Sequence, residues 1–222
     1  MSMDAHVDMT GKVFMITGAN SGIGKATAMA IAGMGADIVM VCRDRGRGEQ
    51  ALQDITSQGD GNVELLLADL SSQEQITRVA AQFLSEERPL HVLVNNAGVT
   101  LNKRSETEDG IESTFAINHL GPFLLTDLLL DVLKGSAPSR IVTVSSSAHM
   151  MGWLDFEDIN SERKYGGMRV YGKSKLANIL FTAELAKRLE GTGVTANAAH
   201  PGPVASNFGR NNDGPMRTMV KM

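Results

Sequence analysis

A short apolar run that leads directly into a glycine-rich loop constrains this chain more than any other feature. Residues 12–17 are rich in side chains that favour a buried parallel strand. The loop TGANSGIG follows at residues 17–24, and a helical pattern continues from Gly22 to about Met34. A helix that begins at such a loop presents unpaired backbone N–H groups and a positive dipole end to a pyrophosphate. The sequence therefore predicts a dinucleotide-binding unit near its start.

The glycines of this loop have distinct predicted tasks. Gly18 allows a tight turn, Gly22 lets the backbone approach the phosphates, and Gly24 permits close packing of helix and strand. An isolated glycine loop can also be a plain structural turn, but the order strand, loop, helix disfavours that alternative. The loop supplies these predicted cofactor-binding residues: Gly18, Asn20, Ser21, Gly22, Ile23 and Gly24.

The residues after the second predicted strand, Asp37–Cys42, bear on the choice of cofactor. Dinucleotide folds usually carry an acid at this point for the free 2′-hydroxyl of the adenosine ribose, whereas a guanidinium suits a 2′-phosphate. Here Arg43 and Asp44 follow the strand. Arg43 therefore favours NADP(H) as the cofactor over NAD(H). The alternative is that Arg43 is a solvated loop cation paired with Asp44.

Composition narrows the class of protein. With 222 residues, 42% hydrophobic and 21% charged, the chain has the size and composition of one domain spanning residues 1–222. The net charge of −4 and the absence of basic runs argue against nucleic acid and anionic membrane as partners. The single cysteine, Cys42, excludes an internal disulfide and a cysteine-cluster metal site, and no metal is predicted. Neither a signal-peptide pattern nor an apolar stretch of roughly 18 residues is found, so a cytoplasmic location is expected.

Strand-like and helical patterns alternate along the rest of the chain. Strands are expected at residues 12–17, 37–42, 62–68, 90–95, 140–145 and 193–199. Helices are expected at residues 22–34, 71–87, 109–133 and 169–189, the second opening on a capping box at Ser71 and Glu74 and the third disturbed near Gly121 and Pro122. This alternation predicts an α/β fold with a doubly wound parallel sheet of the Rossmann type. Ligands of such sheets bind at the carboxyl ends of the strands.

Tyr171 and Lys175 are four residues apart on a predicted helix and therefore share one face. A free phenol has a pKa of about 10, which is too high for efficient proton exchange near neutrality. A neighbouring ammonium favours the phenolate and lowers that pKa. The pair is a candidate acid–base unit, although a tyrosine and a lysine at this spacing also occur by chance on amphipathic helices.

Other polar residues stand at informative positions. Serines 145–147 end the fifth predicted strand, where hydroxyls either face a ligand or simply form turns. Asn118 interrupts an apolar helix, where an amide needs a partner; it either bonds the backbone of a kinked helix or holds a water of a proton relay. His119 and His149 are alternative acid–base candidates, but no carboxylate has motif spacing to either.

Taken together, these motifs resemble the classical short-chain dehydrogenase/reductase family from about residue 11 to residue 207. The TGxxxGxG spacing is similar to the classical branch rather than to the extended branch of epimerases. The resemblance implies that Asp69 and Leu70 contact the adenine ring and that the sequence Asn95-Asn96-Ala97-Gly98 steadies the sheet beside the cofactor. The implied cofactor-binding residues outside the loop are Arg43, Asp69, Leu70, Asn96, Ala97, Gly98, Tyr171, Lys175, Pro201, Gly202 and Val204.

The same resemblance implies a catalytic tetrad of Asn118, Ser146, Tyr171 and Lys175. Tyr171 would exchange a proton with the substrate oxygen, and Ser146 would hydrogen-bond that oxygen, with Ser147 the alternative if the strand slips by one residue. Lys175 would lower the phenol pKa and hold the nicotinamide ribose, and Asn118 would order a water that leads to solvent. The expected reaction is hydride transfer between NADP(H) and a carbonyl or alcohol group of a small apolar substrate.

A finer resemblance is to the retinol dehydrogenase-like subgroup, whose members mostly use NADP(H). It covers residues 42–44, residues 103–126 and residues 174–189, together with the long spacing between Ser146 and Tyr171. Two features depart from the family. Ser21 stands where NADP-preferring members often carry a basic residue. No candidate strand follows Gly202, so either the sequence is cut short or the expected fold lacks the family's last strand and much of its carboxyl-terminal substrate lid.

The sequence is compatible with more than one function and more than one oligomeric state. A non-catalytic NADP(H)-binding sensor or scaffold would keep the fold without turnover. The presence of Tyr171 and Ser146 argues against this alternative, because binding of NADP(H) alone requires neither residue. A nucleotide-sugar epimerase is disfavoured by the glycine spacing. Relatives commonly form homodimers or homotetramers through helices corresponding to residues 109–133 and 169–189, but the apolar richness of the first also suits a core helix.

Overall fold

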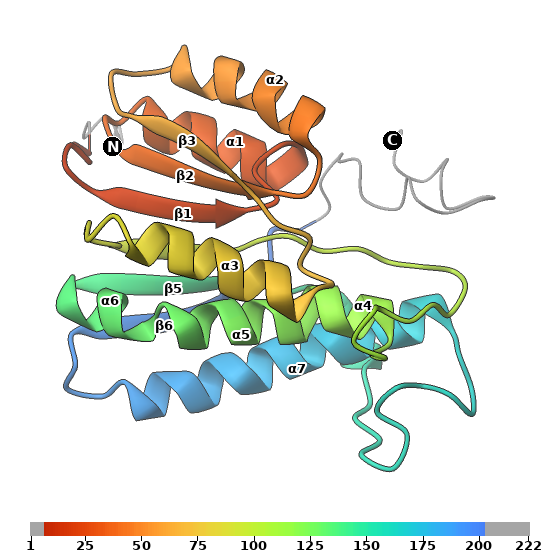
Figure 1. Ribbon diagram of the computed structural model, residues 1–222. Coiled ribbons are helices and arrows are strands. Elements are labelled where there is room, and N and C mark those ends of the chain that lie inside the picture. The colour runs from red at the N-terminus through yellow and green to blue at the C-terminus, as the bar shows by residue number, and fades with distance from the viewer. Residues whose placement is uncertain (1–6, 203–222) are drawn as a thin grey trace.

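A parallel sheet with helices on both faces makes up residues 7–202, the part of the chain that the computed structural model describes (Figure 1). Its strands are β1 (Val13–Thr17), β2 (Asp37–Cys42), β3 (Val63–Leu67), β4 (Val92–Asn95), β5 (Ser139–Val144) and β6 (Val194–Ala199). All neighbouring strands run parallel, in the order β3-β2-β1-β4-β5-β6. The predicted doubly wound fold is confirmed. The strand order reverses between β1 and β4, which places a ligand crevice at their carboxyl ends.

The helices divide between the two faces of the sheet (Figure 1). On one face lie α1 (Gly22–Ala32) and α2 (Arg45–Thr56), and on the other lie α3 (Gln73–Leu84), α5 (Gly121–Leu128), α6 (Leu130–Gly135) and α7 (Gly167–Arg188). Because helices cover both faces of the sheet, successive side chains of β1 pack into different clusters. Met15 packs with the cluster that contains Phe83, and Ile16 packs with the cluster that contains Ile55. Both side chains are fully buried, as expected for a strand covered on both faces.

The expected helix at residues 109–133 is divided into several pieces. The carboxylate of Glu112 accepts the N–H groups of Thr114 and Phe115, so that the first piece, α4 (Ser113–Phe115), begins there. A π-helical segment, η1 (Ala116–Leu120), follows, and α5 starts beside Pro122. Proline cannot donate a backbone hydrogen bond, which favours a break in the regular ladder at this point. The predicted helix is therefore interrupted, as expected near Gly121 and Pro122, but it starts at Ser113 and not at Asp109, and the interruption begins at Ala116.

Smaller differences concern the ends of elements. The capping box predicted at Ser71 and Glu74 is shifted by one residue, because Ser72 caps α3 by accepting the N–H of Gln75. The side-chain oxygen of Gln75 accepts the N–H of Asp69 at 3.0 Å instead of completing a box. In the segment after β5, a short 3-10 helix, η2 (Ser147–Met151), precedes a long irregular stretch, and α7 begins two residues earlier than expected.

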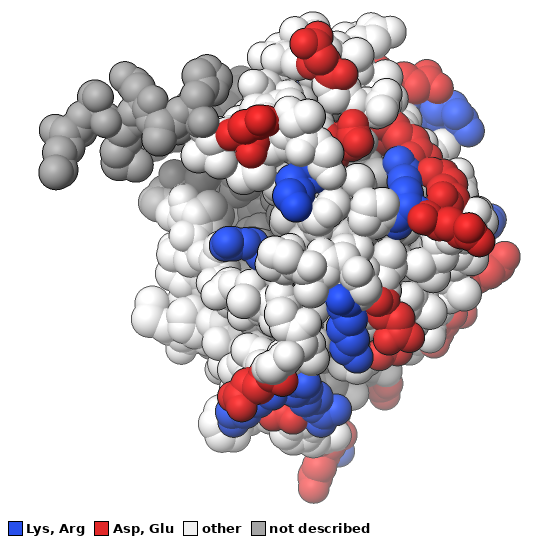
Figure 2. Space-filling model, turned by 90° about the vertical axis from the view of Figure 1, so that its left-hand side faces the viewer, with Lys and Arg blue, Asp and Glu red and all other residues white. Residues whose placement is uncertain are grey.

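The face at the amino ends of the strands carries charges of both signs. Figure 2 shows this face, which lies on the left of Figure 1, with lysines and arginines interspersed among aspartates and glutamates. Such mixing agrees with the small net charge of −4 and gives no extended basic surface in this view. Within residues 7–202, no helix combines the length and the apolar character needed to cross a membrane.

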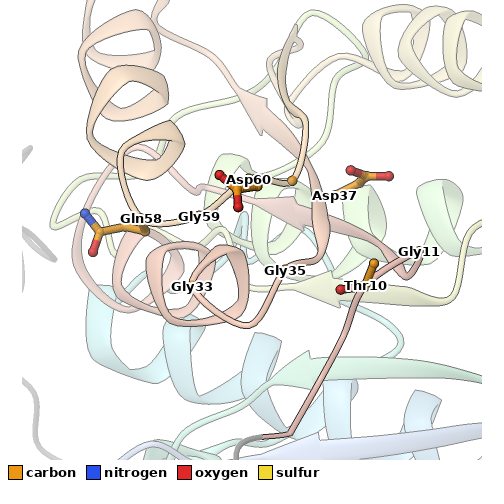
Figure 3. Close-up of a pocket in the computed structure, with 9 residues that line it drawn as sticks. Thr10, Gly11, Gly33, Gly35, Asp37, Gln58, Gly59 and Asp60 are labelled. Carbon is orange, nitrogen blue, oxygen red and sulfur yellow. The ribbon is translucent and has the colours of Figure 1, made fainter.

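A hollow on the same amino edge is explained by packing of glycines. It is lined by the segments before β1, between α1 and β2, and before β3 (Figure 3): Thr10, Gly11, Gly33, Gly35, Asp37, Gln58, Gly59, Asp60 and Gly61. A Cβ on Gly59 would lie 2.1 Å from the carbonyl oxygen of Ala32 at the end of α1, and a Cβ on Gly61 would lie 2.1 Å from that of Ala36 just before β2, so both positions need glycine. None of the predicted site residues lines this hollow, which opens at the opposite edge of the sheet.

Candidate functional site

The glycine loop connects β1 to α1 at the carboxyl edge of the sheet. Gly18 and Gly22 have φ angles of 69° and 54°, in the left-handed region that glycine adopts without strain. A Cβ on Gly24 would lie 2.4 Å from the Nδ2 atom of Asn96 and 2.5 Å from the carbonyl oxygen of Gly18. The loop therefore needs glycine at these positions for its own conformation and packing.

The start of α1 is suited to an anion. Ser21 is the N-cap residue, but its side chain makes no capping hydrogen bond. In contrast, Asp44 and Ser72 each accept a first-turn N–H group of α2 and α3. The first N–H groups of α1 are thus left without a side-chain cap, next to glycines that allow close approach. This arrangement fits the pyrophosphate of a dinucleotide.

Hydrogen bonds tie the loop to the end of β4. The hydroxyl of Thr17 accepts the N–H groups of Asn96 and Ala97, both at 3.0 Å, and the Asn96 amide donates to the Thr17 carbonyl at 2.8 Å. These bonds join β1 and β4 where the strand order reverses. The sequence indicated Asn96 and Ala97 as site residues but gave no role to the Thr17 hydroxyl; a hydroxyl at the last position of an apolar strand was the available signal.

Arg43 and Asp69 form the side of the crevice beyond β2 and β3. The Arg43 guanidinium lies 3.4 Å from the Asp69 carboxylate, and the arginine side chain is 54% exposed. Asp44 is engaged elsewhere, because it caps α2 and accepts the backbone N–H of Arg47 at 2.8 Å. The alternative pairing of Arg43 with Asp44 is therefore replaced by a pair with Asp69. Leu70 is buried beside it and packs against Gly121.

Ser146, Tyr171 and Lys175 converge between β5 and α7. The Lys175 ammonium donates to the Val144 carbonyl at 2.8 Å and lies 5.6 Å from the centroid of the Tyr171 ring. The Ser145 hydroxyl donates to the Lys175 carbonyl at 2.9 Å and so joins the end of β5 to α7. A side-chain hydrogen bond links Ser146 to the Tyr171 phenol. Ser147, the alternative to Ser146, is exposed in η2.

Burial dominates the electrostatics of this group. Desolvation raises the pKa of the Tyr171 phenol, and the hydrogen bond with Ser146 opposes the shift. Desolvation also lowers the pKa of Lys175 to about 8. The direction for Tyr171 differs from the expectation that Lys175 lowers the phenol pKa, because both groups are almost fully buried and each loses hydration of its charged form.

Asn118 lies in the π-helical segment with its amide fully engaged. Its Oδ1 accepts the Val99 N–H at 2.7 Å, and its Nδ2 donates to the Val99 carbonyl at 2.8 Å and to the Ser174 hydroxyl at 3.0 Å. The amide thus bonds the loop after β4 and α7, not the backbone of its own helix. A Cβ on Gly98 would lie 3.4 Å from Asn118 Oδ1 and 3.5 Å from Lys175 Nζ, so Gly98 stands between these two side chains.

Two polar residues of α7 that sequence analysis missed complete this arrangement. The Ser174 hydroxyl accepts from Asn118 Nδ2 at 3.0 Å, and the Asn178 amide donates to the backbone carbonyl of Asn118 at 2.9 Å. A π-helical turn removes carbonyls from the regular α-helical ladder, and Asn178 supplies a partner. Ser174 and Asn178 stand three and seven residues after Tyr171, a spacing that places them on its face of the helix and could have indicated them.

The two histidines are engaged in hydrogen bonds away from the Tyr171 phenol. His119 Nδ1 lies 3.0 Å from Asn178 Oδ1, its ring packs on Phe115, and burial lowers its pKa. His149 Nδ1 lies 2.7 Å from the Ser146 carbonyl oxygen.

Burial raises the pKa of the Cys42 thiol to about 11. Among the described residues, no group of three or more His, Cys, Asp or Glu could hold a metal ion.

Two of the remaining predicted residues lie at the end of β6. Pro201 and Gly202 follow this strand, at the same carboxyl edge as the glycine loop, and Gly202 has a φ of 76°. Val204 lies outside the described residues. The structure thus brings the glycine loop, the end of β4, the serines after β5 and one face of α7 to a single edge of the sheet (right in Figure 1).

The buried Lys175 ammonium predicts a pH dependence of stability. Its pKa falls from 10.5 to about 8 on folding. Between these values the unfolded chain binds the proton more tightly, so the contribution of Lys175 to the free energy of unfolding rises with pH. We expect Lys175→Met to be more stable relative to the unsubstituted protein at about pH 7 than at about pH 9.

Urea denaturation at both pH values measures this difference. Lys187→Met, which removes an exposed lysine from the same helix, is the matched control and should show no comparable change. A Lys175→Met difference that is constant across this range would contradict the depressed pKa.

Comparison with known proteins agrees with this geometry. A model of the family described as "short chain dehydrogenase" matches residues 12–215. The chain is 51% identical to "Retinol dehydrogenase 12" of Mus musculus over 207 residues, covering 93% of this chain and 66% of the relative. It is 50% identical to "Retinol dehydrogenase 14" of Mus musculus, covering 91% of this chain and 64% of the relative. The chain therefore spans slightly less than two thirds of these curated relatives.

Solved structures show the same fold. An uncharacterized protein from Mycobacterium Paratuberculosis is 40% identical with a TM-score of 0.79, covering 88% of this chain and 69% of that one. The "Pseudomonas aeruginosa RhlG/NADP active-site complex" is 25% identical with a TM-score of 0.76, covering 99% of this chain and 90% of that one. The extent of the family match and the identity to two retinol dehydrogenases agree with the strand order and the site: this chain belongs to the short chain dehydrogenase family, and within it is similar to the retinol dehydrogenases.

Proposed function

We propose that this protein is an oxidoreductase that transfers a hydride between NADP(H) and a carbonyl or alcohol group of a small apolar substrate. The observation that carries the proposal is the convergence of Ser146, Tyr171 and Lys175 at the edge of the sheet that also holds the glycine loop. The names of the retinol dehydrogenases support an apolar alcohol or aldehyde, and the NADP complex of a solved relative supports the cofactor class.

The residues present fit the cofactor. The uncapped start of α1 and the glycines of the loop would receive the pyrophosphate. Arg43, half exposed beside Asp69, would bind a 2′-phosphate by exchanging its carboxylate partner for the phosphate. When bound, NADP(H) supplies or accepts the hydride.

The side chains between β5 and α7 would handle the proton. With its pKa raised by burial, Tyr171 is held as the protonated phenol near neutrality and can donate to a carbonyl oxygen during reduction. Ser146, already bonded to the phenol, can stabilise developing negative charge on that oxygen. Lys175 would return a proton toward Tyr171 and bind the ribose. Asn118, whose amide is bonded to Val99 and Ser174, would hold the loop after β4 against α7.

Titration with NADPH and NADH, followed by nicotinamide fluorescence, tests the first part of this proposal. Oxidation of NADPH at 340 nm with decanal, propanal and all-trans-retinal as substrates tests the second. Binding of NADPH with turnover of an apolar aldehyde is the expected result. Binding without turnover of any carbonyl would favour the alternative of a sensor or scaffold, and binding of neither nucleotide would overturn the proposal.

Arg43→Ala should separate the two cofactors. Loss of a charge-assisted contact to the 2′-phosphate predicts a rise in the NADPH dissociation constant of about 10- to 100-fold, whereas the NADH dissociation constant should hardly change. Arg45→Ala is the matched control, because Arg45 lies two residues away, is 70% exposed and pairs with Glu49. Equal weakening of NADPH and NADH in Arg43→Ala would argue against 2′-phosphate recognition by this residue.

A further inference from the structure

One buried lysine has no part in the proton transfer described above. Lys173 lies midway between Tyr171 and Lys175 on α7 and is 4% exposed. Because each helical residue turns the side-chain direction by about 100°, Lys173 points roughly 200° away from Tyr171, to the other side of the helix. Lysine is rarely buried to this extent without specific partners. The buried ammonium of Lys173 therefore needs specific hydrogen-bond partners.

The partners of Lys173 belong to two other segments of the chain. Its Nζ donates to the Ile159 carbonyl at 2.6 Å and to the Ser161 hydroxyl at 2.8 Å, and it lies 5.0 Å from the centroid of the Phe115 ring. An ammonium has three donors and no acceptor, so two hydrogen bonds and an aromatic face satisfy most of its demands. Burial lowers the Lys173 pKa, while the carboxylates of Glu112, Asp158 and Asp155 favour the charged form and Arg104 opposes it.

These contacts connect the elements that carry the candidate catalytic residues. Phe115 precedes Asn118 by three residues, and residues 159–161 belong to the irregular segment that separates Ser146 from Tyr171. We call residues 152–166 the insertion; its loop projects at the lower right of Figure 1, beyond the start of α7. Lys173 is the α7 side chain whose ammonium reaches both the insertion and the ring of Phe115.

The insertion is fixed at further points around Lys173. The Arg104 guanidinium donates to the Asn160 carbonyl at 3.0 Å, and the Tyr165 hydroxyl donates to the Leu101 carbonyl at 2.8 Å. At its start, Gly152 packs so closely on α7 that an added Cβ would lie 2.5 Å from the Gly172 carbonyl oxygen. The insertion therefore begins against the residue next to Tyr171, and the contacts of Lys173 hold its middle.

The end of η2 and the start of the insertion present apolar side chains to solvent. Met150, Met151, Trp153 and Phe156 are between 60% and 83% exposed. Exposed apolar side chains of this size, gathered in seven residues, are typical of a surface that contacts an apolar ligand. Their place is set by η2, which starts directly after Ser146 and packs against α7.

From these contacts we infer that Lys173 is a positioning residue: it fixes the insertion to α7 and so holds the apolar side chains of residues 150–156, which follow Ser146 in the chain, in place to receive the apolar part of the substrate. This inference rests on the proposed function. Lys173 touches neither the reacting atoms nor the cofactor site, and its effect is on how well the substrate binds.

Limited proteolysis tests the structural half of the inference without any substrate. Chymotrypsin cleaves after Trp153 and Phe156, which lie in the insertion. Lys173→Met keeps the length of the side chain but removes its hydrogen bonds, so we expect cleavage there to be about fivefold to tenfold faster. Lys187→Met, an exposed position of the same helix, should be cleaved at the original rate. Ser161→Ala removes only one of the two acceptors and should give a smaller increase in the cleavage rate. This variant provides the test if Lys173→Met does not fold.

Steady-state kinetics test the functional half. In Lys173→Met or Ser161→Ala we expect the KM for decanal to rise by about fivefold, with kcat and the NADPH dissociation constant nearly unchanged and with a smaller change for propanal. A general loss of stability would instead reduce kcat and NADPH binding together, and that result would overturn the inference. So would cleavage rates and KM values equal to those of the unsubstituted protein. Should the unsubstituted protein turn over no carbonyl, the proposed function fails on that ground, while the proteolysis still decides whether Lys173 holds the insertion.

Discussion

Replacement of Tyr171 by phenylalanine should reduce NADPH-dependent turnover by about 1000-fold, the range expected for loss of a general acid. The substitution removes one oxygen and leaves the ring, so the packing of α7 and the NADPH dissociation constant should stay the same. The reason is geometric: the phenol is bonded to Ser146 and lies beside Lys175, where a substrate oxygen would receive its proton. Turnover is measured by NADPH oxidation and binding by nicotinamide fluorescence.

Tyr165→Phe is the matched control, because the chain has two tyrosines. The Tyr165 hydroxyl donates to the Leu101 carbonyl and lies on the insertion, away from Ser146. Its loss should leave kcat within about threefold, as for a single neutral hydrogen bond. A Tyr171→Phe variant with full turnover would exclude Tyr171 as the proton donor. A variant with lost turnover and lost NADPH binding would show damage to the fold and leave no support for a specific role.

Replacement of Gly24 by alanine should abolish cofactor binding, with a rise in the NADPH dissociation constant of more than about 100-fold. The added Cβ would lie 2.4 Å from Asn96 Nδ2 and 2.5 Å from the Gly18 carbonyl oxygen. The second contact is to backbone, which cannot move aside as a flexible side chain can. The loop and the Asn96 bonds to Thr17 must therefore shift together, and overpacking of this kind also destabilises by about 1–3 kcal/mol.

Gly135→Ala provides the comparison for Gly24→Ala. A Cβ at Gly135, the last residue of α6, meets no atom within 4 Å. This substitution should leave NADPH affinity unchanged and keep or slightly raise stability, since alanine favours the helical conformation more than glycine does. Thermal unfolding with and without NADPH measures both effects. A Gly24→Ala protein with normal affinity would show that the close approach of α1 to the end of β4 is not needed for the cofactor.

Much of the fold and of the candidate site could be predicted because the evidence for it is local. The apolar run of β1, the glycines that require positive φ angles and the start of α1 depend on neighbours within a few residues. The alternation of strands and helices is likewise a property of short windows, and it implied the parallel doubly wound sheet. The spacing of Tyr171 and Lys175 placed both on one helical face before any tertiary contact was known.

Predictions failed or stayed incomplete where a residue's surroundings come from distant parts of the chain. Arg43 pairs with Asp69 because β3 lies next to β2, and local spacing suggested Asp44. The helix expected at residues 109–133 breaks at a π-helical segment whose freed carbonyl is bonded by Asn178, 60 residues away.

The pKa of Tyr171 rises because neighbouring elements bury the phenol. Lys173 drew no attention in the sequence because its partners are in a segment without regular structure.

The sequence by itself thus determined the fold class, the glycine loop and the shared helical face of Tyr171 and Lys175, since these follow from conformational preferences and periodicity along the chain. Only the tertiary structure decided which polar groups are paired, how strongly each is desolvated and which residues hold the site together. Those properties depend on strand order and helix packing, which bring residues such as Asn118 and Ser174, 56 positions apart, within hydrogen-bonding distance.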